Sequence, residues 1–483
     1  MRNRRPFYGG EDVKSSRVRL SLIACSREIM RIKQITVKHL FGIFDHTINL
    51  NMEERITIIH GKNGFGKTSI LRLVNGFFNL KYSDIRAIPF QKFTIIFDDK
   101  SFVDVVKAST SKNKKSNARP KINFNFTSSD QKEEPTFSPN LLDGKTISFP
   151  LSMIDDVIPG LGRVGAEKWI YTPTEEILDL EDIYERFGEY LPKQFQKGDK
   201  KYPDWLKKIL DSINVRFIES QRLLDISNSA KIGRTIRMPM TLYSVASYSQ
   251  DLAENIQTKL AEYGQISQTL DRTFPARVVQ KKASLTDDEL REKIDQLERE
   301  RNKLISAGLL KKDEDSNFQV KDSIDDSTRK LLSVYIEDVE RKLNVFNDIH
   351  PKVELFKNII NKKYSFKSVT IDQGKGFIFT TEEGEVLSPT DLSSGEQHEL
   401  VILYELLFKV KPNTLILIDE PEMSLHISWQ QEFLKDLQEI TKLSGLDILM
   451  ATHSPDIIND RWDLTVELEK PKQKSKDERT DNT

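Results

Sequence analysis

Apolar residues follow two different spacings along the chain, and the spacing changes twice. From residue 30 to about residue 127, short runs alternate apolar with polar positions, which predicts half-buried strands. From residue 248 to residue 362, apolar residues recur every three or four positions, which predicts helices. Strand patterns return from residue 368 onward, with helical stretches between them. The pattern therefore predicts an α/β fold whose two halves are separated by a helical region.

The helical region contains three candidate helices. The apolar seam of the first, at 248–273, has the spacing of a coiled coil, and Pro275 should end this helix. Thr286, with Glu289 three positions later, predicts the capped start of the second helix, and the third should cover 327–362. We expect 248–362 to form a short antiparallel coiled-coil arm; the alternative is an ordinary helical subdomain.

Shifts in composition predict the remaining borders. Residues 1–29 are polar and basic, which predicts an N-terminal extension, either an arm or the product of a start codon upstream of Met30. We expect 30–247 to form the first half of the α/β fold, with a helical insert at about 150–212. Residues 363–468 should form the second half, and the highly charged residues 469–483 a disordered tail.

Composition narrows the classes of protein. The 483 residues include 73 Lys and Arg against 74 Asp and Glu, so the formal net charge is -1 and no basic field covers the whole chain. Mean hydropathy is -0.49, and no apolar run approaches the ~20 residues that span a bilayer. Cys25 is the single cysteine, which excludes an internal disulfide and a multi-cysteine zinc site. These features exclude a transmembrane protein and predict a cytoplasmic one with no membrane partner.

A phosphate-binding pattern occupies residues 61–68, which match G-x-x-x-x-G-K-[ST] between an expected strand and an expected helix. The glycines let backbone N–H groups surround phosphate oxygens, Lys67 brings a positive charge to the β- and γ-phosphates, and Thr68 offers a hydroxyl ligand to Mg²⁺. ATP and Mg²⁺ are therefore the expected cofactors. The residues expected to hold the nucleotide here are Gly61, Lys62, Asn63, Gly64, Phe65, Gly66, Lys67, Thr68 and Ser69.

An acidic pair ends a second apolar run. Residues 415–418 are apolar and precede Asp419 and Glu420, as at the carboxyl end of a buried parallel strand, where open α/β sheets bind ligands. Asp419 is placed to hold Mg²⁺, and Glu420 to polarise the attacking water. Strands often end in acids, so the motif is informative because it accompanies the phosphate-binding pattern.

A Ser-Ser-Gly-Glu run stands at 393–396, at the start of a helix expected at 392–409. Taken alone, such a run is most often a helix N-cap. Its hydroxyls and free backbone N–H groups at a helix N-terminus would also suit an anion. The candidates for nucleotide contact in this run are Ser393, Ser394, Gly395 and Glu396.

These three motifs, in this order, resemble those of the ATP-binding-cassette ATPases of the SMC, RecF and OLD type. The resemblance covers about 30–82 and 366–465. It implies a P-loop NTPase fold of the ABC/SMC-head type, split by the helical insert and the arm. It further implies ATP hydrolysis by two heads that face each other around ATP. The run at 393–396 would be the signature loop, with Ser394 and Glu396 in place of the usual Gly and Gln.

The same resemblance assigns further site residues. Residues 421–426 are similar to the D-loop, and His453, after a buried strand, is similar to the switch histidine that contacts the γ-phosphate. Gln221, after the strand expected at 215–218, resembles the glutamine that reaches Mg²⁺ and the water. The catalytic residues would then be Glu420, His453 and Lys67, and the metal ligands Thr68, Asp419 and Gln221.

Within this group, the chain most resembles PtuA, the ATPase subunit of Septu anti-phage systems, and its retron-associated relatives; the ATPase subunit of the PARIS system is similarly built. This implies a homodimer through the heads, or a higher oligomer, that controls a separate nuclease subunit of the HNH type. The chain shows no His-Asn-His arrangement and no acidic domain after His453, so we expect no nuclease centre of its own. The alternatives are a RecF/SMC-like ATPase of DNA repair or chromosome maintenance, and an ATP-binding scaffold with negligible turnover.

Contact with DNA or RNA is left open by a basic run. Such a run is more often a solvated loop than a phosphate-binding surface. Its members are Lys112, Lys114, Lys115, Arg119 and Lys121.

Overall fold

The computed structural model describes most of the chain between residues 30 and 469. The described residues are 30–107, 121–139, 154, 158, 160–165, 168–171, 176–187, 202–219, 240–281, 285–312, 324–423, 425 and 427–469. Four predictions lie outside these residues: the N-terminal extension, the role of Gln221, the tail after residue 469, and the basic run except for Lys121, which is exposed.

A parallel sheet forms the centre of the head, with its strands in the order β10-β14-β15-β3-β16. Its strands come from distant parts of the chain, and their bounds are β3 (Ile56–His60), β10 (Asn214–Glu219), β14 (Thr414–Asp419), β15 (Asp447–Ala451) and β16 (Thr465–Glu467). In β14, Leu415 and Leu417 pack into one core and Ile416 and Ile418 into another. A sheet buried on both faces explains the uninterrupted apolar run in the sequence.

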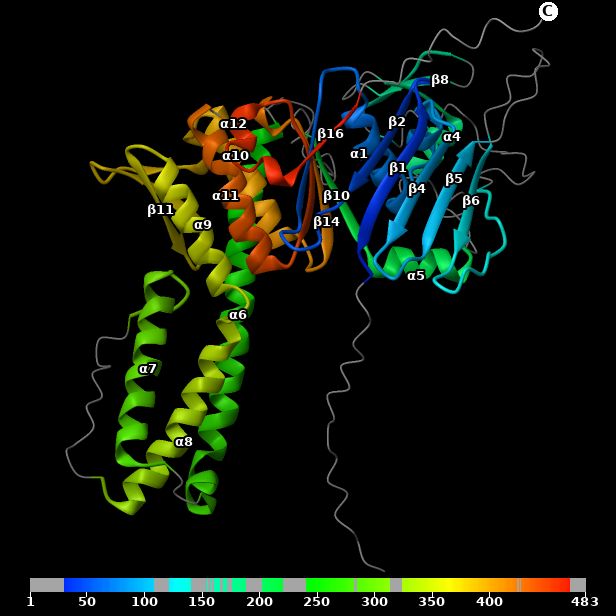
Figure 1. The fold of residues 1–483 in the computed structure, drawn as a ribbon. Coiled ribbons are helices and arrows are strands. Elements are labelled where there is room, and N and C mark those ends of the chain that lie inside the picture. The colour runs from blue at the N-terminus through cyan, green and yellow to red at the C-terminus, as the bar shows by residue number, and fades with distance from the viewer. Residues whose placement is uncertain are drawn as a thin grey trace, which may run out of the picture.

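An antiparallel sheet covers one side of the head, in the order β2-β1-β4-β5-β6 (Figure 1). Helix α1 (Lys67–Phe78) packs between the two sheets, because its apolar residues share a core with both. The other elements here are β1 (Ile32–Leu40), β2 (Phe44–Asn49), β4 (Lys92–Phe97), β5 (Phe102–Lys107), β6 (Ile122–Thr127), α2 (Tyr82–Ala87) and α5 (Asp204–Ser212). The alternation of apolar and polar residues at 92–107 and 121–127 correctly predicted three of these strands.

The predicted helical insert at 150–212 is wrong for its central part. A small antiparallel sheet lies there, made of β7 (Leu161–Arg163), β8 (Lys168–Tyr171) and β9 (Glu176–Asp179). Among the described residues of this segment, α4 (Leu180–Phe187) and α5 are helical. Trp169 and Tyr171 are buried in β8 while Lys168 is exposed, so burial alternates from residue to residue as in a strand. The aromatic and β-branched residues favour such strands.

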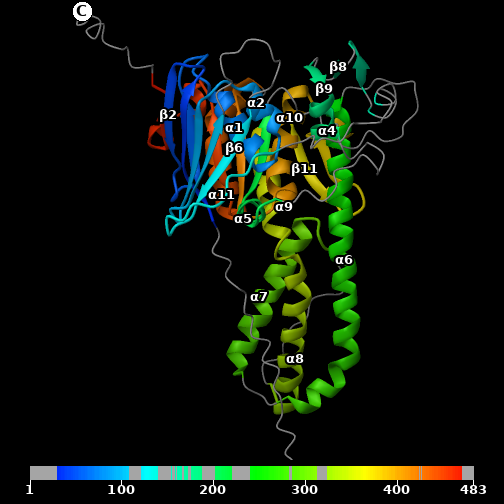
Figure 2. The same ribbon diagram turned by 90° about the vertical axis from the view of Figure 1, so that its right-hand side faces the viewer.

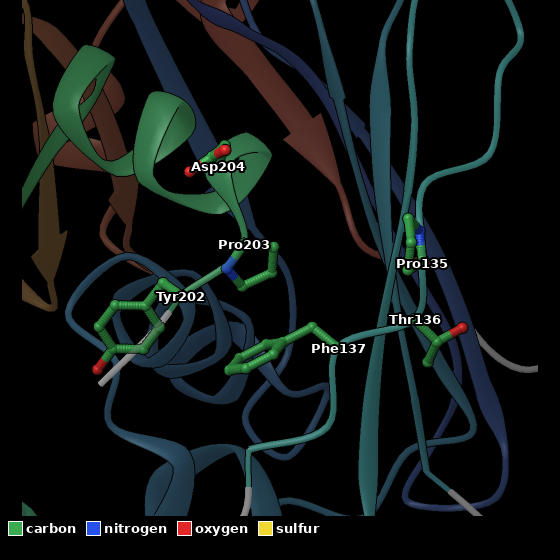
Figure 3. A pocket seen from close by; sticks show the side chains of 6 residues that line it. All are labelled: Pro135, Thr136, Phe137, Tyr202, Pro203 and Asp204. Carbon is green, nitrogen blue, oxygen red and sulfur yellow. The ribbon is translucent and has the colours of Figure 1, made fainter. Parts of the chain in front are cut away.

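A hollow of about 380 Å³ lies where the segment after β6 faces the start of α5 (Figure 3). None of its lining residues belongs to the nucleotide motifs. They are Pro135, Thr136, Phe137, Tyr202, Pro203 and Asp204.

Three helices project from the head as an arm: α6 (Met240–Gln280), α7 (Asp287–Ser306) and α8 (Asp326–Leu343). Helix α6 begins in the head and continues to the far end of the arm (Figure 2), where α8 packs against both α6 and α7. None of the helices that the structure describes is long and apolar enough to cross a membrane.

Helix α6 continues through Pro275, contrary to the sequence prediction. The side chain of Arg277 folds back along this turn, and its Nη2 donates to the carbonyl of Leu270 at 2.9 Å. The same nitrogen donates to Asp338 of α8 at 2.7 Å. A contact between two helices therefore stabilises the turn that the proline disfavours.

The third predicted helix is two helices. Helix α8 ends at Leu343, η2 (Asn344–Phe346) follows, and α9 (His350–Lys363) starts with Pro351 in its first turn, where a missing N–H is tolerated. Helix α9 returns to the head, where it packs on β11 (Lys367–Asp372) and α11 (Ile427–Ser444).

The second half of the head adds a small sheet and several helices. Gly376 begins β12 with φ +79°, and a Cβ there would lie 1.9 Å from the carbonyl oxygen of Ser249, so only glycine lets α6 pack this closely. The elements are β12 (Gly376–Thr381), β13 (Val386–Leu387), η3 (Pro389–Asp391), α10 (Ser394–Tyr404), η4 (Glu405–Lys409), which is π-helical, η5 (Pro421–Met423), α12 (Pro455–Ile458) and η6 (Trp462–Leu464).

Candidate nucleotide-binding site

The phosphate-binding loop joins β3 to α1 at the carboxyl edge of the parallel sheet. Gly64 and Gly66 have φ of +86° and +90°, which other residues rarely adopt. Gly66 also leaves no room for a side chain, since a Cβ would lie 2.4 Å from Cδ2 of Leu40. The amine of Lys67 donates to the carbonyl oxygens of Gly61 at 2.8 Å and Lys62 at 3.5 Å, so the loop closes around its cation.

His46 also holds this loop, although nothing in the sequence pointed to it. Burial lowers the pKa of His46, so the ring is neutral near pH 7 and its Nε2–H donates to the carbonyl of Phe65 at 3.0 Å. Phe44 stacks on His46 and also contacts Phe65. The antiparallel sheet therefore supports the loop from the side.

Thr68 and Asp419 meet although 351 residues separate them. The hydroxyl of Thr68 donates to Oδ1 of Asp419 at 3.1 Å. Their pairing follows from the sheet, because β14 lies beside β15, which lies beside β3, and all three strands are parallel. A hydroxyl and a carboxylate at this distance fit Mg²⁺, which usually takes one or two protein oxygens together with phosphate oxygens and waters.

Glu420 follows with a backbone that is strained. Its φ is +46°, and its N–H donates to the carbonyl of Ala451 at 2.8 Å, which ties the turn after β14 to the end of β15. The side chain is 33% exposed. Strain of this kind persists only where the surrounding structure imposes it, and it concentrates at functional sites.

His453 lies at the same edge, and Glu422 anchors it. Nδ1 of His453 is 3.9 Å from Oε1 of Glu420 and 3.0 Å from Oε1 of Glu422. Glu422 also accepts hydrogen bonds from the backbone N–H of His453 at 3.0 Å and from the hydroxyl of Thr452 at 2.8 Å. Glu422 belongs to the D-loop-like segment, and no local sequence pattern distinguishes it from its neighbours.

The Ser-Ser-Gly-Glu run is the N-terminus of α10, and its helix-cap reading is confirmed. The hydroxyl of Ser393 accepts from the N–H of Glu396, and the N–H of Ser393 donates to the Glu396 carboxylate at 2.8 Å, which is a capping box. The expectation of free groups is wrong for these two N–H groups and for the hydroxyl. Ser394 and Gly395, which lie between Ser393 and Glu396, are in the first turn of the helix.

Lys367 is a further partner that the sequence did not reveal. Its amine lies 2.9 Å from both carboxylate oxygens of Glu396. Although burial acts in the opposite direction, hydrogen bonds from Lys367 and Ser393 lower the pKa of Glu396. The start of α10 is therefore held in place by side chains.

The structure brings together Lys67, Thr68, Asp419, Glu420 and His453 at the carboxyl edge of the parallel sheet. Glu219, which ends β10, lies opposite Asp419 in the register, two residues before Gln221. Among the residues that the structure describes, no cluster of three or more His, Cys, Asp or Glu could hold a metal ion.

Comparison with known proteins agrees with this geometry. The family model AAA_15, described as an AAA ATPase domain, matches residues 30–458. A protein of Escherichia coli described as "Retron Ec83 probable ATPase" is 25% identical over 150 residues, and the match covers 27% of each chain. The chain thus matches about a quarter of the length of that curated relative.

Among solved structures, an Smc head domain of Pyrococcus furiosus with an extended coiled coil, bound to part of ScpA, aligns over 92% of this chain and 94% of that one. The TM-score is 0.34 and the identity 12%. The SMC head domain of Thermotoga maritima aligns over 89% and 91%, with a TM-score of 0.29 and 11% identity. The phosphate-binding loop at the edge of a parallel sheet is that of a P-loop ATPase, and the chain belongs to the AAA_15 family of AAA ATPase domains.

Proposed function

We propose that this chain binds ATP with Mg²⁺ and hydrolyses it, and that two heads form the complete site. The observation that carries the proposal is the contact of Thr68 with Asp419, beside Glu420 and His453. Thr68 and Asp419 hold the metal, which neutralises phosphate charge when bound. Lys67 binds phosphate, Glu420 orients and deprotonates the water, and Gln221 and His453 complete the catalytic set.

The proposed second head supplies the signature loop. Ser393, Ser394 and Gly395 would contact the nucleotide held by the phosphate-binding loop of the other copy. Met423, within the D-loop-like segment, and Ile427, directly after it, are 61% and 67% exposed, and such apolar side chains suit a contact with a second head.

The test of hydrolysis separates binding from turnover. Glu420→Gln should keep ATP binding and lower kcat, whereas Lys67→Ala should lose binding itself. Glu383→Gln, an exposed glutamate in the turn between β12 and β13, is the matched control and should behave as wild type. Wild-type turnover by Glu420→Gln would show that another group is the base.

The test of the two-headed site uses mixed dimers. A Ser393→Arg head paired with a Lys67→Ala head keeps one intact site, so an equal mixture should recover about a quarter of the wild-type activity that both homodimers lack. No recovery at any ratio would mean that the loop does not act on a second head.

The cellular role we propose is regulatory: the ATPase subunit of an anti-phage defence complex that restrains a separate nuclease, of the HNH type, while ATP is bound. The similarity to the retron ATPase of Escherichia coli supports this role. The chain alone should hydrolyse ATP and leave DNA uncut. Metal-dependent cleavage by the pure chain that survives every substitution at the ATPase site would overturn the proposal.

The arm is the proposed docking element for the nuclease. Lys259 of α6 and Asp348 before α9 form an ion pair of 2.9 Å, so a short linker can join the chain there and remove the arm. This deletion should release the nuclease subunit from the purified complex while ATPase activity persists. Removal of the residues after Lys470 should leave the complex intact. A replication or recombination protein co-purifying in place of a nuclease would favour the repair alternative.

A further inference from the structure

Three helices of the second half of the head meet at a buried group of charges. Lys363 ends α9, Glu399 lies in α10 and Asp436 lies in α11. Their side chains are 1%, 2% and 8% exposed. The amine of Lys363 forms an ion pair with Oε1 of Glu399 and another, of 2.5 Å, with Oδ2 of Asp436. One cation thus bridges two helices that would otherwise bring two carboxylates together.

The electrostatics make Lys363 the member on which the group depends. Burial raises the pKa of Glu399 and that of Asp436, while Lys363 acts to lower both. Glu432 of α11 adds negative charge near both carboxyls, and Lys362 pairs with Glu432 at 2.7 Å. Without Lys363, two buried carboxylates would face each other without their shared ion-pair partner, which favours separation of α10 from α11.

The two bridged helices carry the two segments expected to face a second head. Helix α10 begins at the Ser393 cap, and Glu399 lies six residues further along it. Helix α11 follows the D-loop-like segment, and Gln430 in its first turn donates to the carbonyl oxygens of Glu422 and Leu425. Lys363 therefore controls the position of the signature loop relative to the D-loop-like segment.

Residues next to Lys363 also contact the start of α10. The hydroxyl of Tyr364 donates to the carbonyl of Glu396 at 2.5 Å, and Lys367 binds the Glu396 carboxylate. Three contacts from five consecutive residues thus hold the start of α10. These residues follow α9, the helix by which the chain returns from the arm to the head (Figure 1).

We infer that Lys363 is a positioning residue for the nucleotide site of the opposite head, because it keeps the signature loop and the D-loop-like segment in one rigid arrangement. This inference rests on the proposed two-headed site. ATP binding uses the phosphate-binding loop of the same chain, which Lys363 does not touch, so its loss should lower kcat and spare KM.

The experiment begins with Lys363→Met, which keeps the length of the side chain and removes its charge. The ATPase kcat should fall on the order of 10- to 100-fold, as expected for misplaced catalytic groups, with KM for ATP little changed. Lys362→Met is the matched control. Lys362 is adjacent in the chain, but its ion pair with Glu432 is exposed, so the kcat of this variant should stay near wild type. An unchanged kcat in Lys363→Met would overturn the inference.

Mixed dimers then show in which head Lys363 acts. Lys363→Met mixed with Lys67→Ala should recover activity, whereas Lys363→Met mixed with Ser393→Arg should not, because both lesions lie on the signature side. The reverse pattern would overturn the inference. If Lys363 had a merely structural role, its substitution would lower the melting temperature, and recovery of activity would not depend on which variant head is mixed with it.

The Ser393→Arg and Lys67→Ala mixture distinguishes the two levels of failure. If that mixture recovers and the Lys363→Met and Lys67→Ala mixture does not, the role of Lys363 falls alone. If neither mixture recovers, the proposal of a two-headed site is refuted, and the proposed role of Lys363 is refuted with it. Should Lys363→Met not fold, the triple variant with Glu399→Gln and Asp436→Asn removes all three charges and is tested in the same mixtures, with the same outcomes deciding.

Discussion

Two regions of the head are built by different means. One is the carboxyl edge of the parallel sheet with its phosphate-binding loop, called the nucleotide edge below, and the other is the start of α10. At the nucleotide edge, parallel strands, glycines and backbone hydrogen bonds place Lys67, Thr68 and Glu420. At the start of α10, side-chain ion pairs and caps from Lys363, Lys367 and Ser393 do this work. A strand has neighbours that fix its register, whereas the N-terminus of a helix has unpaired N–H groups and depends on side chains. We therefore expect substitutions in the two regions to fail in different ways.

The largest effect should come from the backbone of the nucleotide edge. Gly66→Ala places a methyl group 2.4 Å from Leu40 at φ +90°, so the loop must distort. ATP affinity should fall on the order of 100-fold by isothermal titration, consistent with a few kcal/mol of strain. Gly384→Ala, at φ +87° in open space, is the control and should leave affinity unchanged. Equal losses in both variants would refute the role of the close contact with Leu40.

A smaller effect should follow from loosening His453. Glu422→Gln removes the charge that holds His453 and Thr452. We expect kcat to fall about 10-fold with KM for ATP nearly constant, since the phosphate-binding loop is untouched. Steady-state kinetics across ATP concentrations make the comparison, and a rise in KM alone would place Glu422 in binding instead.

The signature cap should show a modest effect on stability. Ser393→Ala removes the side-chain acceptor for Glu396 N–H and should reduce the free energy of unfolding by about 1 kcal/mol in urea titrations. Ser393→Asp keeps a capping acceptor and should recover most of that loss. If alanine cost nothing, the start of α10 would not depend on its cap, and the contrast between the two regions would weaken.

The smallest effect is a difference in pH dependence between two glutamates of α10. The pKa of Glu399 is raised from 4.5 by burial, so its stabilising contribution is complete below pH 4.5 and is lost as pH rises through the raised pKa. The pKa of Glu396 is lowered despite burial, so its contribution is present above pH 4.5 and is lost as pH falls.

Urea titrations at several pH values test this pair. Glu399→Gln should flatten the loss of unfolding free energy above pH 4.5, and Glu396→Gln should flatten the loss below it. Slopes that change in the same direction for both variants would contradict the opposite environments of the two carboxyls.

The sequence by itself determined the parts of the site that depend on contiguous residues. The spacing of Gly61, Gly66, Lys67 and Thr68 is typical of one phosphate-binding loop, and the apolar run before Asp419 is typical of a strand buried on both faces. These local constraints predicted which residues should meet. Even so, Thr68 and Asp419 are 351 residues apart, and the order of strands in the sheet brings them together.

Only the tertiary structure decided the features that rest on pairs distant in the chain. Helix α6 runs through Pro275, where Arg277 ties the turn to Leu270 and to Asp338 of α8, and β7, β8 and β9 pair with one another where a helix was expected. Lys363 is an ordinary lysine in the sequence; its meeting with Glu399 and Asp436 depends on how three helices pack. A side chain's partners set the free energy of its charge, and a sequence pattern records spacing along one element, not the neighbours that folding supplies.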